Sequence, residues 1–375
     1  MTITLPSVEE IENLEGKRVL CRVDFNVPVK DGKVQDVYRI EKERRTIEYL
    51  RDAGAKVILA SHFKSKEGNS LEPVARYIKH YVFDLTFVGG CVGGEVFDEV
   101  SKMKNGDVLL LENLRSHKGE EANDESFARD LASLADVYVN EAFSVSHREH
   151  ASIVGVPTHL PGYAGFRLLE EIEKLSDAFH PSHPFVFILG GAKFDTKLPL
   201  LEKFLDKANT VFLGGALAND VFQAQGLEVG ESLVSGSEFD LTEVLKNEKV
   251  LLPEDVVIET TEIVKLAQVG RANKILDAGP MTIENLKEKL LGAAFVLWNG
   301  PLGDYEHGFT DGTLALARAV ADSPAETIVG GGDTLAAIEE LDMLDQFDFV
   351  STGGGAMLDF LANETLPGIE VLKRH

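Results

Sequence analysis

The sequence is poor in basic residues relative to acidic ones. Among its 375 residues, 37 are Lys or Arg and 62 are Asp or Glu, which gives a formal net charge of −25. Nucleic acids and anionic membranes repel a surface with this excess of carboxylate. We therefore expect neither as a partner of this protein.

Cysteine and long apolar runs are also scarce. The two cysteines, Cys21 and Cys91, lie within or beside apolar stretches, where buried thiols are common, and they cannot build a framework of several disulfides. The first ten residues lack the basic and apolar segments of an export signal, and no stretch of about 18 residues is apolar enough for a membrane span. We expect a reduced, cytoplasmic protein.

Two common nucleotide-binding fingerprints are missing as well. No Gly-x-Gly-x-x-Gly occurs, and the pair Gly16-Lys17 lacks the other residues of a P-loop. A nicotinamide-dependent oxidoreductase, one alternative for an α/β protein, is disfavoured by this absence. Any phosphate site must be built in another way.

What the sequence does contain is an alternation of short β-branched or aliphatic runs with helical stretches. This alternation predicts βαβ units and mostly parallel sheets. We predict strands at 18–23, 56–60, 82–88, 108–111 and 137–139 in the first half, and at 185–189, 210–213, 295–298, 327–329 and 347–350 in the second. We predict helices near 37–52, 71–80, 125–135, 197–207, 218–225, 283–291, 311–321, 333–341 and 357–362.

A helical segment at 168–179, with proline and glycine on both sides, separates the halves. We expect a first domain at 1–162, a connecting hinge helix at 163–180, a second domain at 181–360 and a segment at 361–375 that returns to the first domain. An ordinary crossover helix inside one domain is the alternative. Residues 1–165 hold 21 basic and 27 acidic residues (net −6), and the remainder holds 16 and 35 (net −19).

The strongest feature is that five predicted strands of the second half end in similar glycine-rich turns. These turns contain Gly190-Gly191, Gly214-Gly215, Asn299-Gly300, Gly330-Gly331-Gly332 and Gly353-Gly354-Gly355. Glycine allows close backbone approach, and N–H groups at the start of the next helix bind anions. One such turn is ordinary packing, but five at the carboxyl edge of one sheet favour a phosphate site.

Charged side chains are placed next to these turns. Lys193 and Lys197 follow the first turn at a spacing of four, and Asp333 follows three glycines. Two ammonium groups and one carboxylate suit phosphoryl transfer, which needs charge neutralisation and an oxygen ligand for Mg²⁺. In the alternative interpretation, the lysines form a solvated helix face and Asp333 is a helix N-cap.

Basic residues follow the predicted strands of the first half. Arginine suits bidentate capture of a carboxylate or phosphate, and strand ends would bring these groups to one sheet edge. The residues at these positions are Arg22, His62, Arg115, His147, Arg148 and His150. For Arg22 and His150 we favour a surface salt-bridge role.

In order and spacing, these motifs resemble those of the phosphoglycerate kinase family along essentially the whole chain. The matching segments are Arg22-Val-Asp-Phe-Asn-Val-Pro28, Leu111-Glu-Asn-Leu-Arg115, Ala142-Phe143 with His147-Arg148, Leu189-Gly-Gly-Ala-Lys193, Trp298-Asn-Gly-Pro301, Gly330-Gly-Gly-Asp-Thr334 and Ser351-Thr-Gly-Gly-Gly-Ala356. The resemblance implies an α/β fold of two doubly wound parallel-sheet, Rossmann-like domains that face across a hinge cleft. It also implies reversible phosphoryl transfer between 1,3-bisphosphoglycerate and ADP, giving 3-phosphoglycerate and ATP, in a monomer that uses Mg²⁺.

The resemblance assigns roles to individual positions. The phosphoglycerate would be held by Asp24, Asn26, Arg39, His62, Arg115 and Arg148. The nucleotide would be held by Lys193, Lys197, Gly214, Gly215, Gly279, Pro280, Asn299, Glu306, Gly331, Gly332, Asp333 and Thr334, with Asp333 also on the metal. The groups acting on the transferred phosphoryl would be Arg39, Lys193, Gly331 and Gly354.

The chain departs from the family pattern near the acid site. The family usually has Ser-His-Leu-Gly-Arg-Pro where this chain has Ser61-His-Phe-Lys-Ser-Lys66, so Ser65 stands in place of an arginine. Glu141 and Ser144 replace the usual Asp and Gly. These changes bear on substrate affinity more than on the reaction, and a non-catalytic nucleotide-binding protein remains an alternative.

Overall fold

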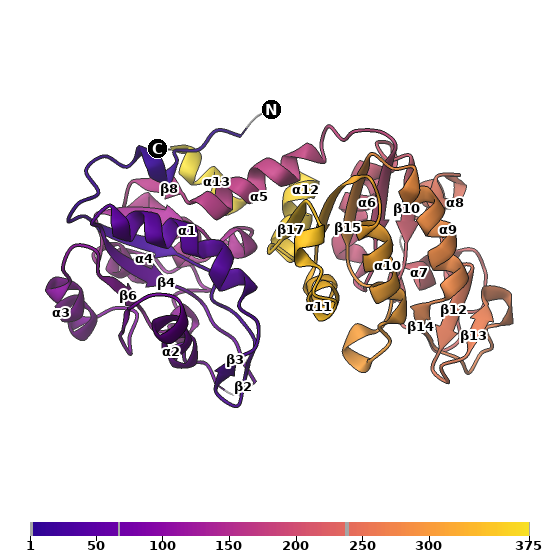
Figure 1. Ribbon diagram of the computed structural model, residues 1–375, viewed down its shortest axis with the longest axis horizontal. Helices are drawn as coiled ribbons and strands as arrows, with labels where there is room; N and C mark the ends of the chain where they lie inside the picture. Colours follow the sequence, from indigo (N-terminus) through magenta and orange to yellow (C-terminus); the bar gives the residue numbers. More distant parts are fainter. Residues whose placement is uncertain (1–2, 67, 237–239, 375) are drawn as a thin grey trace. The chain divides into compact units, whose positions relative to one another are not determined.

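Two parallel β-sheets, each flanked by helices, carry the fold (Figure 1). The computed structural model describes residues 3–66, 68–236 and 240–374. The chain divides into one unit formed by residues up to Glu173 and from Asn363 onward, and a second unit formed by Lys174–Ala362. The predicted α/β class, with a doubly wound sheet in each half, is confirmed.

The sheet of the first unit reverses its direction of winding beside its central strand. Its order is β5 (Thr86–Phe87), β6 (Val108–Leu110), β4 (Lys56–Ala60), β1 (Arg18–Arg22), β7 (Val137–Asn140) and β8 (Gly162–Ala164), with all neighbours parallel. From β1 the chain first adds β4, β5 and β6 on one side, and it then crosses to add β7 and β8 on the other side. Ligands of such sheets bind beyond the carboxyl ends of the strands at this reversal point.

The rest of the first unit covers this sheet. Its other elements are η1 (Val8–Glu10), the hairpin β2 (Val29–Lys30) and β3 (Lys33–Val34), α1 (Tyr38–Asp52), α2 (Glu72–Tyr81), α3 (Gly94–Lys102), η2 (Leu114–Ser116), α4 (Glu125–Ala132), η3 (Phe143–Val145), η4 (Ala151–Gly155), η5 (Val156–Thr158), α13 (Pro367–Glu370) and η9 (Leu372–Arg374). The helix α5 (Phe166–Asp177) continues from this unit into the second.

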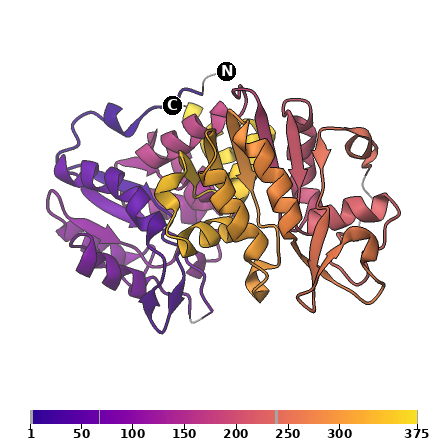
Figure 2. The same cartoon turned by 45° about the vertical axis from the view of Figure 1, so that its right-hand side comes forward.

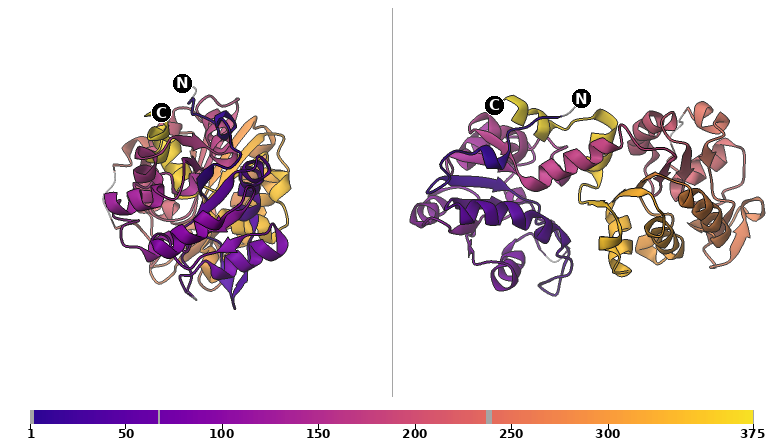
Figure 3. Two further views of the ribbon diagram at one scale, coloured as in Figure 1. Left: turned by 90° about the vertical axis from the view of Figure 1, so that its left-hand side faces the viewer. Right: turned by 45° about the horizontal axis from the view of Figure 1, so that its top comes forward.

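Both ends of the described chain lie in the first unit (Figure 3). The amide of Ala164 on β8 donates to the carbonyl of Pro6 (2.8 Å), and that of Gly368 donates to the carbonyl of Ser146 (2.8 Å). The chain therefore leaves the first unit through α5 and returns to it after α12.

The second sheet has the same kind of reversal. Its order is β11 (Val250–Leu251), β10 (Thr210–Leu213), β9 (Phe185–Leu189), β15 (Phe295–Asn299), β16 (Glu326–Gly330) and β17 (Phe349–Ser351), all parallel. Every residue of β9 and β15 is buried, as expected for central strands covered on both faces. The winding reverses between β9 and β15. Because all strands of this sheet are parallel, all five predicted glycine turns lie at one carboxyl edge, as predicted.

Helices and a small antiparallel sheet complete the second unit. The helices are α6 (Phe194–Leu205), α7 (Ala216–Ala224), α8 (Thr242–Lys246), η6 (Leu266–Gln268), α9 (Pro280–Leu291), η7 (Tyr305–His307), α10 (Asp311–Ala321), α11 (Gly332–Glu340), η8 (Leu344–Gln346) and α12 (Gly355–Asn363). The small sheet has the order β13 (Ile263–Lys265), β12 (Asp255–Ile258) and β14 (Ile275–Ala278). Figure 2 shows α9 and α10, in orange, packed side by side.

Several predicted boundaries are wrong. The strand expected at 82–88 is reduced to Thr86–Phe87. The helix α3 and the antiparallel sheet were not predicted. Strands of an antiparallel sheet pair across turns, without a crossover helix between them. The helix expected at 283–291 begins at Pro280, because proline suits the first helical turn. No helix in the described part of the chain has the length and apolar character needed to cross a membrane.

Candidate active site

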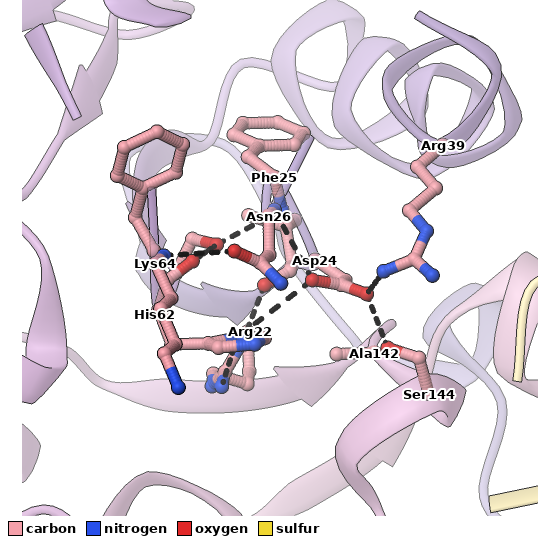
Figure 4. Close-up of polar contacts among 12 residues, drawn as sticks. Arg22, Asp24, Phe25, Asn26, Arg39, His62, Lys64, Ala142 and Ser144 are labelled. Carbon is pink, nitrogen blue, oxygen red and sulfur yellow. Dashed lines mark hydrogen bonds and ion pairs between the residues drawn. The ribbon is translucent and has the colours of Figure 1, made fainter. Parts of the chain in front are cut away.

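The carboxylate of Asp24 is the centre of a polar cluster just beyond β1 (Figure 4). Its Oδ2 accepts hydrogen bonds from Arg39 Nη1 (2.7 Å) and from the Ser144 hydroxyl. Its Oδ1 accepts one from the backbone amide of Asn26 (3.2 Å). Burial opposes ionisation of Asp24, but the facing Arg39 guanidinium and the Ser144 hydroxyl help to lower its pKa to about 2. Asp24 is therefore an anion that fixes the direction of Arg39.

His62 and Asn26 both approach Oδ1 of Asp24. His62 is only 4% exposed, and its Nδ1 is 3.7 Å from Asp24 Oδ1. The side-chain oxygen of Asn26 accepts the amide hydrogen of Lys64 (2.8 Å), which ties the loop after β4 to the loop after β1. The ends of two neighbouring strands thus converge at one point of the sheet edge.

Two further arginines contribute positive charge to this edge. Arg115 Nη2 is buried and has no hydrogen-bond partner among the described residues, while its Nε lies 3.2 Å from Glu121 Oε1. Burial, and then the charge of Arg148, lower the pKa of Arg115. Arg148 is exposed. A guanidinium with a buried, unsatisfied N–H group is suited to receive an anion.

The surface role expected for Arg22 is wrong. Arg22 is only 1% exposed, and its Nε donates to Ser152 Oγ (2.8 Å). His150 is also largely covered, with 12% of its side chain exposed and Nδ1 3.9 Å from Glu120 Oε1. The strand position of Arg22 gave no sign of burial, because its partner Ser152 is 130 positions away in the sequence.

A second layer of carboxylates lies beneath Asp24. Both side-chain oxygens of Glu43 accept the Asp24 amide hydrogen (2.9 and 2.8 Å), and burial raises the pKa of Glu43. Glu141 Oε1 accepts the amide of Arg167 (3.0 Å), and burial raises the pKa of Glu141 to about 8. A Cβ atom on Gly165 would lie 1.8 Å from Glu141 Oε2. Glutamate at position 141, which is longer than the usual aspartate of the family, therefore requires glycine at position 165.

In the second unit, the turn after β9 separates the two predicted lysines. Lys193 is exposed and has φ 65°, whereas Lys197 is buried on the first turn of α6 and donates to the Gly190 carbonyl. The alternative interpretation, in which both lysines form a solvated helix face, is wrong, because Lys193 precedes the helix in the left-handed region and Lys197 is buried. Burial lowers the pKa of Lys197 to about 8, although Asp333 acts in the opposite direction.

Three glycine turns approach one another closely at this edge. A Cβ atom on Gly190 would lie 2.3 Å from the Pro301 carbonyl oxygen, and one on Gly215 would lie 2.6 Å from the Gly191 amide nitrogen. The Gly191 amide donates to the Pro301 carbonyl (2.6 Å). Only glycine permits these backbone contacts, which bring the ends of β9, β10 and β15 together.

A cavity of about 330 Å³ opens beside these turns. Among the predicted nucleotide residues, Gly215, Glu306 and Asp333 line it. Other lining residues were not predicted, because they come from elements far apart in the sequence; they include Asn219, Leu233, Pro253, Val256 and Tyr305. The lining is largely apolar with a polar rim, as in sites for small organic ligands.

The remaining predicted residues surround this cavity or support it. Gly214 packs against Leu302, and Gly279, followed by Pro280 at the start of α9, packs against Asp255. The buried Thr334 Oγ1 accepts the Gly300 amide hydrogen (3.1 Å), and the buried Asn299 side chain contacts Met357 Sδ (3.6 Å).

Asp333 lies in the first turn of α11, and Gly331 takes the N-cap position, with φ 110° and no side-chain cap. The alternative reading of Asp333 as the N-cap is therefore wrong. Burial and then Glu306 raise the pKa of Asp333. Gly332 follows Gly331 and is exposed, and Gly354, with φ 47°, lies in the turn after β17.

The described residues contain no group of three or more His, Cys, Asp or Glu side chains that could hold a metal by themselves. Mg²⁺ is commonly held by only one or two protein carboxylates together with substrate phosphates. The exposed Asp333 carboxylate beside Lys197 and the cavity fits such a role.

Comparisons with known proteins agree along the chain. A family model described as "Phosphoglycerate kinase" matches residues 8–364. Phosphoglycerate kinases from Moorella thermoacetica and Dictyoglomus turgidum are 45% and 43% identical to this chain, over 99% and 96% of its length and 98% and 97% of theirs.

Two solved structures are also similar. A phosphoglycerate kinase from Coxiella burnetii is 36% identical, has a TM-score of 0.82 and covers 99% of both chains. One from Pyrococcus horikoshii is 30% identical, has a TM-score of 0.86 and covers 98% of both.

Proposed function

The chain belongs to the phosphoglycerate kinase family and is a glycolytic phosphotransferase, and from this premise we propose how its two sites divide the reaction between 1,3-bisphosphoglycerate and ADP. The observation that carries the proposal is that each sheet has a cluster of groups suited to anions at its carboxyl edge, beside the point where the winding reverses. The first is rich in arginine, and the second in backbone N–H groups and lysine.

The first unit holds the three-carbon acid. Arg39, aligned by Asp24, faces the carboxyl end at which transfer occurs, and the unsatisfied N–H of Arg115 binds a phosphate or carboxylate oxygen. Arg148, His62 and Asn26 complete the set. Arginine suits this task because its planar fork matches the oxygens of both groups.

The second unit holds the nucleotide. The cavity takes the adenosine, with Glu306 toward the ribose, and the turns at Gly214–Gly215, Gly279–Pro280 and Gly331–Thr334 position it. Lys197 and Asn299 bind the phosphate chain, and Lys193 accompanies the transferred phosphoryl. Asp333 would hold Mg²⁺, which neutralises phosphate charge when bound.

The chemistry requires positioning more than proton transfer. The carboxylate of 3-phosphoglycerate is ionised near neutral pH, so it attacks without a general base, and the same holds for the terminal oxygen of ADP in reverse. Lys193, Arg39 and the backbone N–H groups near Gly331 and Gly354 stabilise the charge of the phosphoryl in line between donor and acceptor.

Because the two ligands bind to different units, transfer requires the units to close over them. Closure also excludes water, which would otherwise hydrolyse the acyl phosphate. We place the hinge at 163–180, which includes most of α5, and the domains on either side at 1–162 and 181–360, with 361–375 returning to the first. We further propose a cytoplasmic monomer.

A coupled assay with ATP, Mg²⁺ and 3-phosphoglycerate tests the proposal. We expect turnover by the wild type and a loss of at least about 100-fold in kcat for Lys193→Ala, since one charged group stabilises the transferred phosphoryl. The exposed Lys289→Ala, on α9, is the matched control and should keep wild-type turnover. Absence of wild-type turnover would overturn the function, and an active Lys193→Ala enzyme would overturn the role of this lysine.

A further inference from the structure

We propose that Arg22 is a positioning residue that fixes His62 as a neutral imidazole with its hydrogen on Nε2. A buried chain of hydrogen bonds from Glu120 through Ser152 holds Arg22 in place. The inference rests on the proposed function in one respect, namely that His62 faces the bound acid.

Arg22 is held from several directions. Its Nε donates to Ser152 Oγ (2.8 Å), one Nη donates to the Val23 carbonyl, and the other lies 3.4 Å from His62 Nδ1. All of these groups are buried, and Arg22 itself is 1% exposed. A buried guanidinium held by three contacts has little freedom to turn away from His62.

At the other end of this series of hydrogen bonds, Glu120 supplies the charge that balances Arg22. Glu120 is fully buried and accepts hydrogen bonds from the Ser152 hydroxyl (2.6 Å) and the Ser152 amide (3.0 Å). Because Ser152 donates its hydroxyl hydrogen to Glu120, its oxygen is left to accept from Arg22. The direction of every hydrogen bond from Glu120 to Arg22 is thereby determined.

The same reasoning extends to the imidazole. Arginine has donors only, so a hydrogen bond between Arg22 and His62 requires Nδ1 to be the acceptor. The competing arrangement would place a hydrogen on Nδ1 and direct it to Asp24 Oδ1, but that separation is 3.7 Å, beyond hydrogen-bond range. The hydrogen of the neutral ring is therefore on Nε2.

The charges around His62 favour the neutral ring. Burial, together with Arg22, Arg115 and Arg148, lowers the pKa of His62 to about 3, while Asp24 acts in the opposite direction. The polar contacts of the His62 ring with other residues in the described segments involve Nδ1, and none involves Nε2. His62 thus offers the acid a hydrogen-bond donor without a charge, and the arginines supply the charge.

Nitrogen NMR of the full-length, ¹⁵N-histidine-labelled protein tests this assignment without any ligand or turnover. The His62 signals are identified by their loss in His62→Gln. We expect the Nε2–H form, with no titration between about pH 5 and 8, a range well above the lowered pKa. An Nδ1–H form, or protonation within that range, would overturn the proposal whether or not the enzyme is active.

Two variants on β1 separate positioning from general stability. Arg22→Met removes the donor to Nδ1, so we expect the hydrogen to move to Nδ1 beside Asp24, or a titration to appear. Arg18→Met, at an exposed ion pair with Asp136 (2.6 Å), is the control and should leave the His62 signals unchanged. If Arg22→Met does not fold, Arg22→Lys is used in its place. The single ammonium nitrogen of lysine cannot contact Ser152, Val23 and His62 together, as the three guanidinium nitrogens do. Unchanged His62 signals in the folded variant would overturn the proposal.

Kinetics give an independent measurement. A glutamine side chain can place its N–H₂ near the position of Nε2, whereas asparagine reaches only the position of Nδ1. We expect the KM for 3-phosphoglycerate to be about tenfold lower in His62→Gln than in His62→Asn, the factor for one hydrogen bond to a charged group. Equal or reversed values would contradict a donor at Nε2.

Discussion

Ser65 is a single residue whose identity should set the affinity for the acid. It lines a hollow together with Asn26, Lys30, Lys64 and Lys66, where the family pattern has an arginine in its place. A lysine ammonium is a point charge, whereas a guanidinium can bind two oxygens of one phosphate.

We therefore predict that Ser65→Arg lowers the KM for 3-phosphoglycerate by about tenfold, which corresponds to about 1.4 kcal/mol. Initial-rate kinetics at saturating ATP would measure it. Ser65→Lys is the control that separates added charge from bidentate geometry, and it should lower KM less. An unchanged or higher KM for Ser65→Arg would show that the neighbouring lysines already fulfil this role.

Glu141 should make stability depend on pH. Burial raises its pKa from 4.5 to about 8, so between these values the folded protein holds a proton that the unfolded chain has lost. Stability contributed by that proton is present below about pH 4.5 and declines as pH rises toward 8. The buried Glu43, whose pKa is raised mainly by burial, acts in the same direction.

We predict that Glu141→Gln flattens this decline and raises the free energy of unfolding at pH 7 by up to about 3 kcal/mol. Urea denaturation at a series of pH values from about 5 to 8 would measure it. The exposed Glu149→Gln should leave the slope unchanged. Equal slopes in wild type and Glu141→Gln would contradict the prediction.

At the scale of elements, the glycine turns determine how the strand ends of the second sheet meet. The turns after β9 and β15 touch through backbone atoms, as the Gly191 amide and Pro301 carbonyl show (2.6 Å). No side chain can be inserted there without moving one turn away from the other. These turns therefore act as packing contacts, and in the proposed function they also bind anions.

We predict that Gly190→Ala lowers the free energy of unfolding by about 2–3 kcal/mol, as in overpacked cores, and weakens ADP binding. Thermal unfolding and calorimetric titration with Mg-ADP would measure both effects. Gly292→Ala, at the C-cap of α9, is the control, because its Cβ atom would lie 3.9 Å from the Lys289 carbonyl oxygen. A Gly190→Ala protein with normal stability and ADP affinity would contradict the role of this contact.

Element boundaries show where local patterns fail. The buried strands β9, β10, β15 and β16 were predicted well, because continuous β-branched and aliphatic runs are a local signal. The small sheet β12–β14 was missed because its strands are short and antiparallel, and its outer strand β13 is largely exposed. Its contribution to the nucleotide cavity, through Val256, has no local signal.

At the scale of the whole molecule, the net charge of −25 must be reconciled with two anionic substrates. In the proposed function, the near-balanced first half supplies arginines for the acid, and the acidic second half uses backbone N–H groups, two lysines and the metal that accompanies the nucleotide.

We predict that small-angle X-ray scattering shows a smaller radius of gyration with Mg-ADP and 3-phosphoglycerate together than with either alone. The reason is that transfer requires both ligands to meet in a water-free site. Single-ligand samples are the controls. No compaction with both ligands bound would contradict hinge closure at 163–180 while leaving the kinase assignment intact.

The ligands and the residues assigned to them were implied by the resemblance of the sequence to the phosphoglycerate kinase family. The sequence by itself determined the two α/β halves and the glycine turns at one sheet edge. These follow from short-range patterns of apolar, glycine and charged residues. Only the tertiary structure decided that Arg22 is buried against Ser152, that Lys193 and Lys197 face different surroundings, and that distant segments line the cavity. Burial, and with it pKa and hydrogen-bond direction, depends on residues that are remote along the chain.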